Sequence, residues 1–197
     1  MADVAVLEDP DAARMAIEPV RAGLLAELAT EPSSAAGVAA RLGLPRQKVG
    51  YHLNALAGQG LVVEVDRRRH GGLTERVFAA SARAYVISPL AMGPIGADPA
   101  RVADRLSSSY LLALAARAVR EVGALVRGAS AAGRRLPTLS VDVDIRLASA
   151  AERAAFAEDL AAAVRDLAAR YHDAASPAGR WYRLVAFAHP RVRSSEA

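Results

Sequence analysis

Apolar residues recur at helical spacing in three successive stretches of the first 60 residues. The first stretch, residues 11–29, predicts a helix with Asp11 as its N-cap. Pro19 falls inside this pattern, so the helix is expected to begin near it or to be kinked there. The acidic residues 1–10 are expected to form a frayed end. The apolar positions of the first stretch are Met15, Ile17, Val20, Leu24, Leu25 and Leu28.

The second and third stretches are joined by a sharp turn at Gly43. Ser34 is a good N-cap for a helix that runs to Leu42. After Gly43, Pro45 suits the first turn of a helix that ends at the glycines of residues 58–60. Its apolar positions follow one another at intervals of four and three residues and form one inward stripe, namely Val49, Leu53 and Leu56.

Beyond residue 60 the pattern changes from helical spacing to alternation. Residues 61–65 are strand-like, residues 67–72 read as a turn, and residues 73–79 return as a second strand. Three helices followed by a hairpin predict a winged helix. We therefore expect residues 1–83 to form a winged helix-turn-helix domain.

The second half of the chain combines two further helical and two alternating stretches. Prolines and glycines punctuate residues 84–100 and predict a linker. Residues 101–128 predict a long helix, and residues 149–171 a second one with a capping box formed by Ser149 and Glu152. Residues 139–147 and 180–188 alternate and predict strands. The expected fold class is α+β, with a small helix–strand–helix–strand region at residues 101–190 and a tail at 191–197.

Composition limits the chemistry that the chain can support. The 197 residues are 53% hydrophobic and 23% charged, as in a globular protein, and include no cysteine. Disulfides, thiolate metal sites and cysteine nucleophiles are therefore excluded. Residues 1–31 lack the basic start of a signal peptide, and the longest apolar run, residues 110–116, is too short to span a membrane. We expect a cytoplasmic protein that does not enter membranes.

Charge is distributed unevenly along the chain. Residues 1–32 carry a net charge of −5, whereas residues 44–83 carry +4 within a total of +4. Positive charge is therefore concentrated where the third helix and the hairpin lie, as expected of a surface that binds anions. A solvated, arginine-rich surface is the alternative explanation.

A helical wheel assigns an outward face to the third predicted helix. Gln47, Tyr51 and Asn54 lie on this face, opposite the apolar stripe. Gln and Asn can each hold adenine through a donor–acceptor pair, and Arg can hold guanine in the same bidentate way. Three further residues flank the face or precede it in the first turn, and we include them among the candidate DNA contacts: Arg46, Lys48 and Gly50.

The hairpin supplies a second candidate contact. Arg67, Arg68, Arg69 and His70 come at its tip and could reach phosphates or enter a narrow minor groove. The alternative is a basic turn exposed only to water. His52 lies nearer the inward side of the third helix, where a packed or phosphate-contacting histidine is expected more than a base reader.

The first 83 residues resemble a known family. The runs at residues 38–44 and 49–53, followed by Leu56 and by Gly60-Leu61-Val62, are similar to the winged helix-turn-helix of ArsR-type bacterial transcription regulators. The resemblance covers about residues 12–83. It implies a homodimer that binds a palindromic operator on double-stranded DNA, commonly as a repressor released by an effector.

The family's metal-sensing residues are missing from this chain. Metal-sensing members carry a cysteine pair in the second helix, where this chain has Ala36-Gly37-Val38-Ala39. Other members bind zinc through paired Asp and His on a helix after the wing, but residues 101–128 contain no histidine and one aspartate, Asp104. The resemblance therefore gives no support to a metal or to any other cofactor.

The remaining motifs do not point to an enzyme. The four histidines are scattered, and no phosphate loop or nucleophile motif occurs. Asp142 and Asp144 could bind a cation, although the solvent face of a strand explains them more simply. We expect residues 101–190 to supply the dimer contact and a pocket for a small organic effector, because they hold a broad apolar helix and the aromatic residues Trp181, Tyr182 and Phe187. An alternative function is a protein interaction module whose basic wing docks an acidic partner.

Overall fold

The computed structural model describes residues 1–70 and 73–191 of the chain. The chain divides into two units, Met1–Leu136 and Pro137–Ala197, and the described residues of each are treated separately. In the described part of the chain, no helix combines the length and the apolar character needed to cross a membrane.

The first predicted helix is two helices, α1 (Pro10–Ile17) and α2 (Pro19–Thr30). Glu18 between them has extended backbone angles, because the residue before a proline is disfavoured in the helical region. The N-cap of α1 is Asp9 rather than the expected Asp11: its carboxylate accepts hydrogen bonds from the amides of Asp11 and Ala12. The Glu18 carboxylate caps α2 in the same way, and the hydrogen bond from the Arg21 amide lowers the pKa of Glu18.

The helix-turn-helix has the predicted form. The Ser34 hydroxyl accepts a hydrogen bond from the Gly37 amide at 3.2 Å and starts α3 (Ala35–Leu42). Gly43 follows in the left-handed conformation with a φ of 64°, and α4 (Arg46–Gly58) begins after Pro45. Arg41 of α3 forms an ion pair with Glu27 of α2 at 2.5 Å. The core between these helices includes Leu24, Leu28, Val38, Val49, Leu53 and Leu56.

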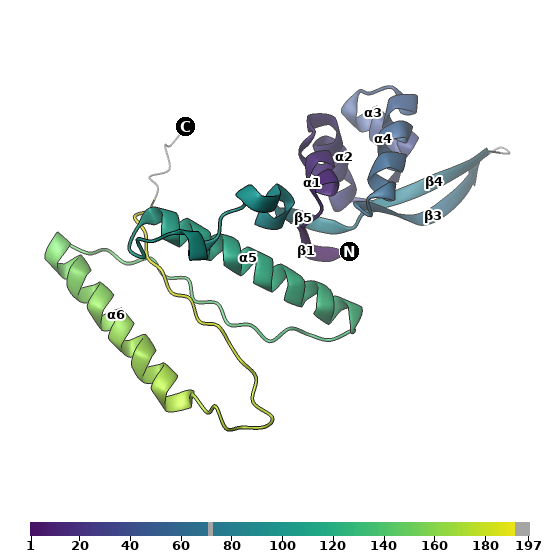
Figure 1. Ribbon diagram of the computed structural model, residues 1–197. Coiled ribbons are helices and arrows are strands. Elements are labelled where there is room, and N and C mark those ends of the chain that lie inside the picture. Colours follow the sequence, from purple (N-terminus) through teal and green to yellow (C-terminus); the bar gives the residue numbers. More distant parts are fainter. Residues whose placement is uncertain (71–72, 192–197) are drawn as a thin grey trace. The chain divides into compact units, whose positions relative to one another are not determined.

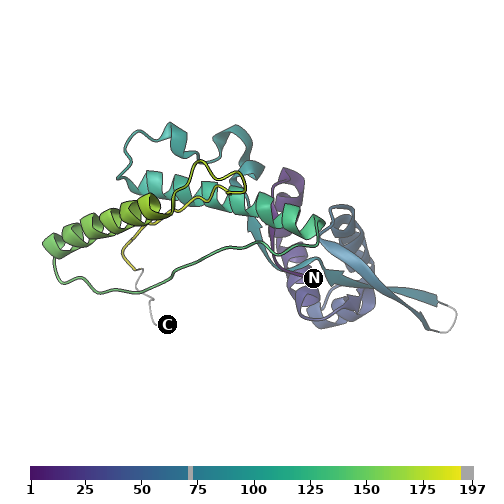
Figure 2. The same ribbon diagram turned by 90° about the horizontal axis from the view of Figure 1, so that it is seen from below.

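The wing is a long ribbon of two strands. Antiparallel β3 (Val62–His70) and β4 (Leu73–Ala80) extend away from the helices, as Figures 1 and 2 show. The short β2 (Ser33–Ser34) pairs with the other side of β4. The predicted turn at residues 67–72 is thus wrong for residues 67–70, which continue β3. Gly71 and Gly72 lie outside the described residues.

The acidic start of the chain is ordered as a strand, contrary to the expected frayed end. β1 (Ala2–Leu7) pairs in parallel with β5 (Ala82–Ile87). Residues 84–100, expected to be a linker, therefore contain most of β5 and two 3-10 helices, η1 (Pro89–Ile95) and η2 (Pro99–Arg101). The prolines and glycines of this segment belong to these short helices and to a kink at Gly93 within η1, and not to an irregular linker.

Helix α5 (Ser108–Ala131) packs on β1 through its smallest side chains. Gly123 is buried against Val6, and Arg127 forms an ion pair with Glu8 at 2.6 Å. Helix α5 also carries large apolar residues that remain exposed by 39–65% of their surface, namely Leu112, Val122, Leu125 and Val126. We refer to these four residues as the α5 apolar stripe.

In the second unit only the helix is formed as predicted. Helix α6 (Ala150–Tyr171) begins at Ser149, whose hydroxyl accepts a hydrogen bond from the Glu152 amide at 3.1 Å. The described residues 139–147 and 180–188 contain no strand, so the helix–strand–helix–strand arrangement is corrected. Alternation makes a segment able to form a strand, but a strand also requires a paired backbone, which these segments lack. A salt bridge of 2.9 Å joins Arg191 to Asp144.

Candidate nucleic-acid interface

The buried stripe of α4 fixes which of its side chains face outward. Val49, Leu53 and Leu56 are fully buried, as predicted. The opposite face presents Gln47, Tyr51 and Asn54 to solvent, and Tyr51 is 68% exposed. Arg46 and Lys48 are also exposed, at the start of the helix. Burying these polar groups would cost free energy without a partner, so the face suits a polar ligand.

Gly50 lines an open hollow of about 160 Å³ between α4 and β4. A Cβ atom built on Gly50 would meet no atom within 4 Å. The fold of the free protein therefore does not require glycine at this position, although glycine in a helix interior costs about 1 kcal/mol relative to alanine. Glycine at this position would instead allow a ligand to approach α4 closely.

The arginines of the wing lie on opposite sides of the ribbon. Side chains alternate along a strand, so Arg67 and Arg69 share one face of β3 and Arg68 takes the other. Arg67 is paired in register with Arg76, whereas Arg68 forms an ion pair with Asp66 at 3.3 Å. Had residues 67–69 formed a turn, no such division would exist. His70 is the last residue of β3.

A β-bulge brings Glu64 and Arg67 to the same face. The register shifts between Glu64 and Asp66, which leaves Val65 as the extra residue of β3. Because of this shift, two residues three apart in sequence point the same way, and the Glu64 carboxylate pairs with both Arg67 and Arg76. Hydrogen bonds from Arg67, and then from Arg76, lower the pKa of Glu64.

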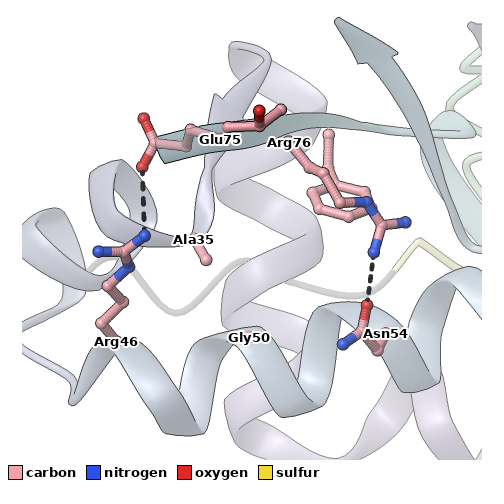
Figure 3. Close-up of a pocket in the computed structure, with 8 residues that line it drawn as sticks. Ala35, Arg46, Gly50, Asn54, Glu75 and Arg76 are labelled. Carbon is pink, nitrogen blue, oxygen red and sulfur yellow. Dashed lines mark hydrogen bonds and ion pairs between the residues drawn. The ribbon is translucent and has the colours of Figure 1, made fainter. Parts of the chain in front are cut away.

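Arg76 connects the wing to the outward face of α4, and the sequence patterns did not select it. Its Nη1 donates to Oδ1 of Asn54 at 3.0 Å, as Figure 3 shows, and its Nε donates to Glu64 at 2.6 Å. Arg46 of α4 also approaches Glu75 of β4, with 4.0 Å between nitrogen and oxygen. The available sequence signal was alternation: Arg76 lies two residues before the buried Phe78, on the same side of β4.

His52 belongs to the support of α4 rather than to its outer face. Its Nδ1 accepts a hydrogen bond from Nε of Arg21 at 3.3 Å, which joins α4 to the start of α2. Burial, followed by the nearby charge of Arg21, lowers the pKa of His52. The neutral ring is thus the form that the fold favours, in agreement with a packed histidine.

Comparison with known proteins agrees with this geometry. Residues 17–65 match the model of a helix-turn-helix domain family. No curated protein matches the chain at a significant level.

Two solved structures are similar to the chain at low identity. One is the homodimeric winged helix-turn-helix DNA-binding domain (fragment 1-100) of Mb0332 from Mycobacterium bovis, described as a possible ArsR-family transcriptional regulator. It has 15% identity and a TM-score of 0.30, and the match covers 64% of this chain and 84% of that one. The other is a mutant of ZitR from Lactococcus lactis in apo form, with 13% identity, a TM-score of 0.24 and coverage of 73% and 78%.

The matched segment contains α2, α3 and α4 and the start of β3. The structure completes it with β4 as a wing, which is the arrangement that the resemblance to ArsR-type regulators implied. The first unit therefore contains a winged helix-turn-helix, and its residues 17–65 are similar to the helix-turn-helix domain family.

Proposed function

We propose that the protein is a sequence-specific, DNA-binding transcription regulator that places α4 in the major groove of double-stranded DNA. The observation that carries this proposal is the outward face of α4. Gln47, Tyr51 and Asn54 are exposed on it, directly opposite a fully buried stripe. The arginine-bearing wing lies beside this face and supplies contacts to phosphates or to the minor groove.

The test is a binding assay with the protein's own upstream DNA against a scrambled duplex of equal length. We expect preferential binding of the upstream fragment, with affinity that falls steeply as salt rises, because each Lys or Arg contact to a phosphate releases counterions. Equal affinity for both duplexes, or a flat salt response, would contradict the proposal. Binding only to an acidic protein would instead favour an interaction module docked through the wing.

We further propose a homodimer that binds a palindromic operator. The α5 apolar stripe exposes four large side chains along one helix, and a second copy would cover it with an identical surface. Two copies of α4 would then read half-sites separated by about 34–36 Å or a multiple of it. Sedimentation should give a dimer at micromolar concentration. A stable monomer for the full chain, with a dimer absent on operator DNA, would refute this part.

We propose that the protein represses transcription and that it acts in the cytoplasm. A small organic effector bound within residues 101–190 would relieve the repression. The resemblance to ArsR-type regulators supports the repressor role, and the exposed apolar and aromatic residues of this region support an effector site. A reporter placed behind the operator should be less active when the protein is present. Loss of the gel shift on addition of one metabolite from a panel would identify the effector.

A further inference from the structure

Arg76 is held in a fixed orientation by three groups. Nε donates to Glu64 at 2.6 Å, Nη1 donates to Asn54 at 3.0 Å, and the guanidinium lies 4.7 Å from the centre of the Phe78 ring. Phe78 is buried and therefore forms a rigid base. Most exposed arginine side chains lose rotamer entropy when they bind a ligand. For Arg76, much of this loss has already occurred in the free protein.

The contact with Arg76 changes what Asn54 can do. Because arginine only donates hydrogen bonds, the Asn54 amide must turn its oxygen toward Arg76 and its NH₂ group away. The Asn54 oxygen is then directed at Arg76, and the amide presents its NH₂ group to a ligand, which differs from the side-by-side donor–acceptor pair with which asparagine holds adenine. The two side chains together form one unit rich in N–H donors.

The part of the chain that the structure describes uses two of the five guanidinium N–H groups of Arg76 in hydrogen bonds. The side chain remains 46% exposed, at the edge of the hollow between α4 and β4. A planar donor fork with a fixed direction matches the O6 and N7 acceptors of guanine, and purely ionic contact with a phosphate would not need such support.

We propose that Arg76 is a specificity-determining residue that reads guanine together with Asn54, and that Glu64 is the positioning residue that holds it. This inference rests on the proposed binding of DNA by α4. Glu64 acts from β3, where it lies opposite Phe78 in the register and so shares a face with Arg76. Its carboxylate also pairs with Arg67, so one acidic residue organises both arginines on this face of the ribbon.

The test begins with the binding site that the full-length wild-type protein selects from random duplexes. Arg76→Ala and Asn54→Ala should each lose discrimination at the same base pair, by roughly 5- to 150-fold, as expected of one bidentate contact. The double variant should lose little more than either single variant, because the two side chains act as one unit. Arg76→Lys keeps the charge but lacks the fork, and it should lose the discrimination while retaining affinity for random DNA.

Two variants control for charge. Arg83→Ala removes an exposed arginine of β5, whose ion pair is with Asp3, and should leave discrimination unchanged. Glu64→Gln should reduce discrimination at the same base pair without weakening the binding of random duplex. Asp66→Asn makes the same change of charge on the opposite face of β3 and should not alter the preferred sequence.

Retention of the base preference by Arg76→Lys, or equal weakening on all sequences by Arg76→Ala, would refute the inference and leave a phosphate contact. Wild-type protein that selects no sequence would refute the proposed function itself, so the two failures are distinguishable. Thermal unfolding of each variant shows whether it is folded, and Arg76→Lys decides the matter if Arg76→Ala is not.

Discussion

Gly123 of α5 lies directly on Val6 of β1. A Cβ atom built on Gly123 would come within 2.9 Å of one γ-carbon of Val6 and within 3.1 Å of the other. Helix α5 therefore approaches the strand more closely than any residue with a side chain would allow. The Arg127–Glu8 ion pair at 2.6 Å, one turn further along, joins the same two elements.

This close approach predicts that Gly123→Ala destabilises the protein. Overpacking costs about 1–3 kcal/mol, and Val6 has a stiff, branched side chain that cannot turn aside. The gain in helix propensity, about 1 kcal/mol, offsets part of the cost. We expect the free energy of unfolding, measured with denaturant, to fall by about 1 kcal/mol. Gly128→Ala in the same helix meets no atom within 4 Å and should not destabilise.

Gly50→Ala is expected to stabilise the fold but to weaken DNA binding. Gly50→Ala should raise the free energy of unfolding by about 0.5–1 kcal/mol, because alanine favours the helix and no atom of the chain obstructs it. Binding of operator DNA should weaken by about 1–3 kcal/mol if the duplex approaches this part of α4. Gly23→Ala in α2 is a matched control, since it is also unobstructed. It should stabilise the protein without changing DNA affinity, and equal affinities for all three proteins would argue against the close approach.

Gln47 and Lys48 should differ in how their loss affects DNA binding. Gln47→Ala should reduce affinity by about 1–3 kcal/mol at one base pair and relax the preference there. Lys48→Ala should weaken binding to every sequence and lower the slope of log affinity against log salt by about 1. Titrations of single-base operator variants at several salt concentrations separate the two patterns. Similar patterns for both variants would mean that the reading face of α4 is wrongly assigned.

The lowered pKa of His52 predicts that the protein loses stability at mildly acidic pH. Its pKa is lowered in the folded protein, so below the ordinary value of 6.5 the unfolded chain binds a proton that the folded chain does not. The contribution of His52 is therefore fully present above pH 6.5 and is lost as the pH falls toward the folded pKa. Denaturant unfolding at pH 7.5 and pH 5.5 should show a larger loss for wild type than for His52→Gln. The other histidines are common to both proteins, so equal losses would contradict the assignment.

Much of the winged helix could be predicted from local patterns. The cap at Ser34, the left-handed Gly43 and the stripe of Val49, Leu53 and Leu56 each depend on neighbours within one or two turns. The outward face of α4 follows from the same periodicity. The hydrogen bond between Asn54 and Arg76 could not be predicted in this way, because Arg76 comes from a different element.

Features that depend on distant partners could not be predicted in this way. The bulge at Val65 exists only relative to β4, and it determines which arginine meets Glu64. Residues 139–147 alternate as regularly as any strand, yet within the described chain they have no paired neighbour. Alternation indicates which side chains of a segment would share a face, but it does not show whether another strand pairs with that segment.

The pairing of β1 with β5 has a consequence for how the protein folds. Ala2 aligns with Ala82, so the whole winged helix lies within the loop that this pairing closes. Closing a long loop costs entropy before its contacts are gained, and local helical contacts form much faster. Helices α1 to α4 and the wing should therefore fold first, and β1 should dock last. Because α5 packs against Val6 of β1, the docking of this strand also positions α5.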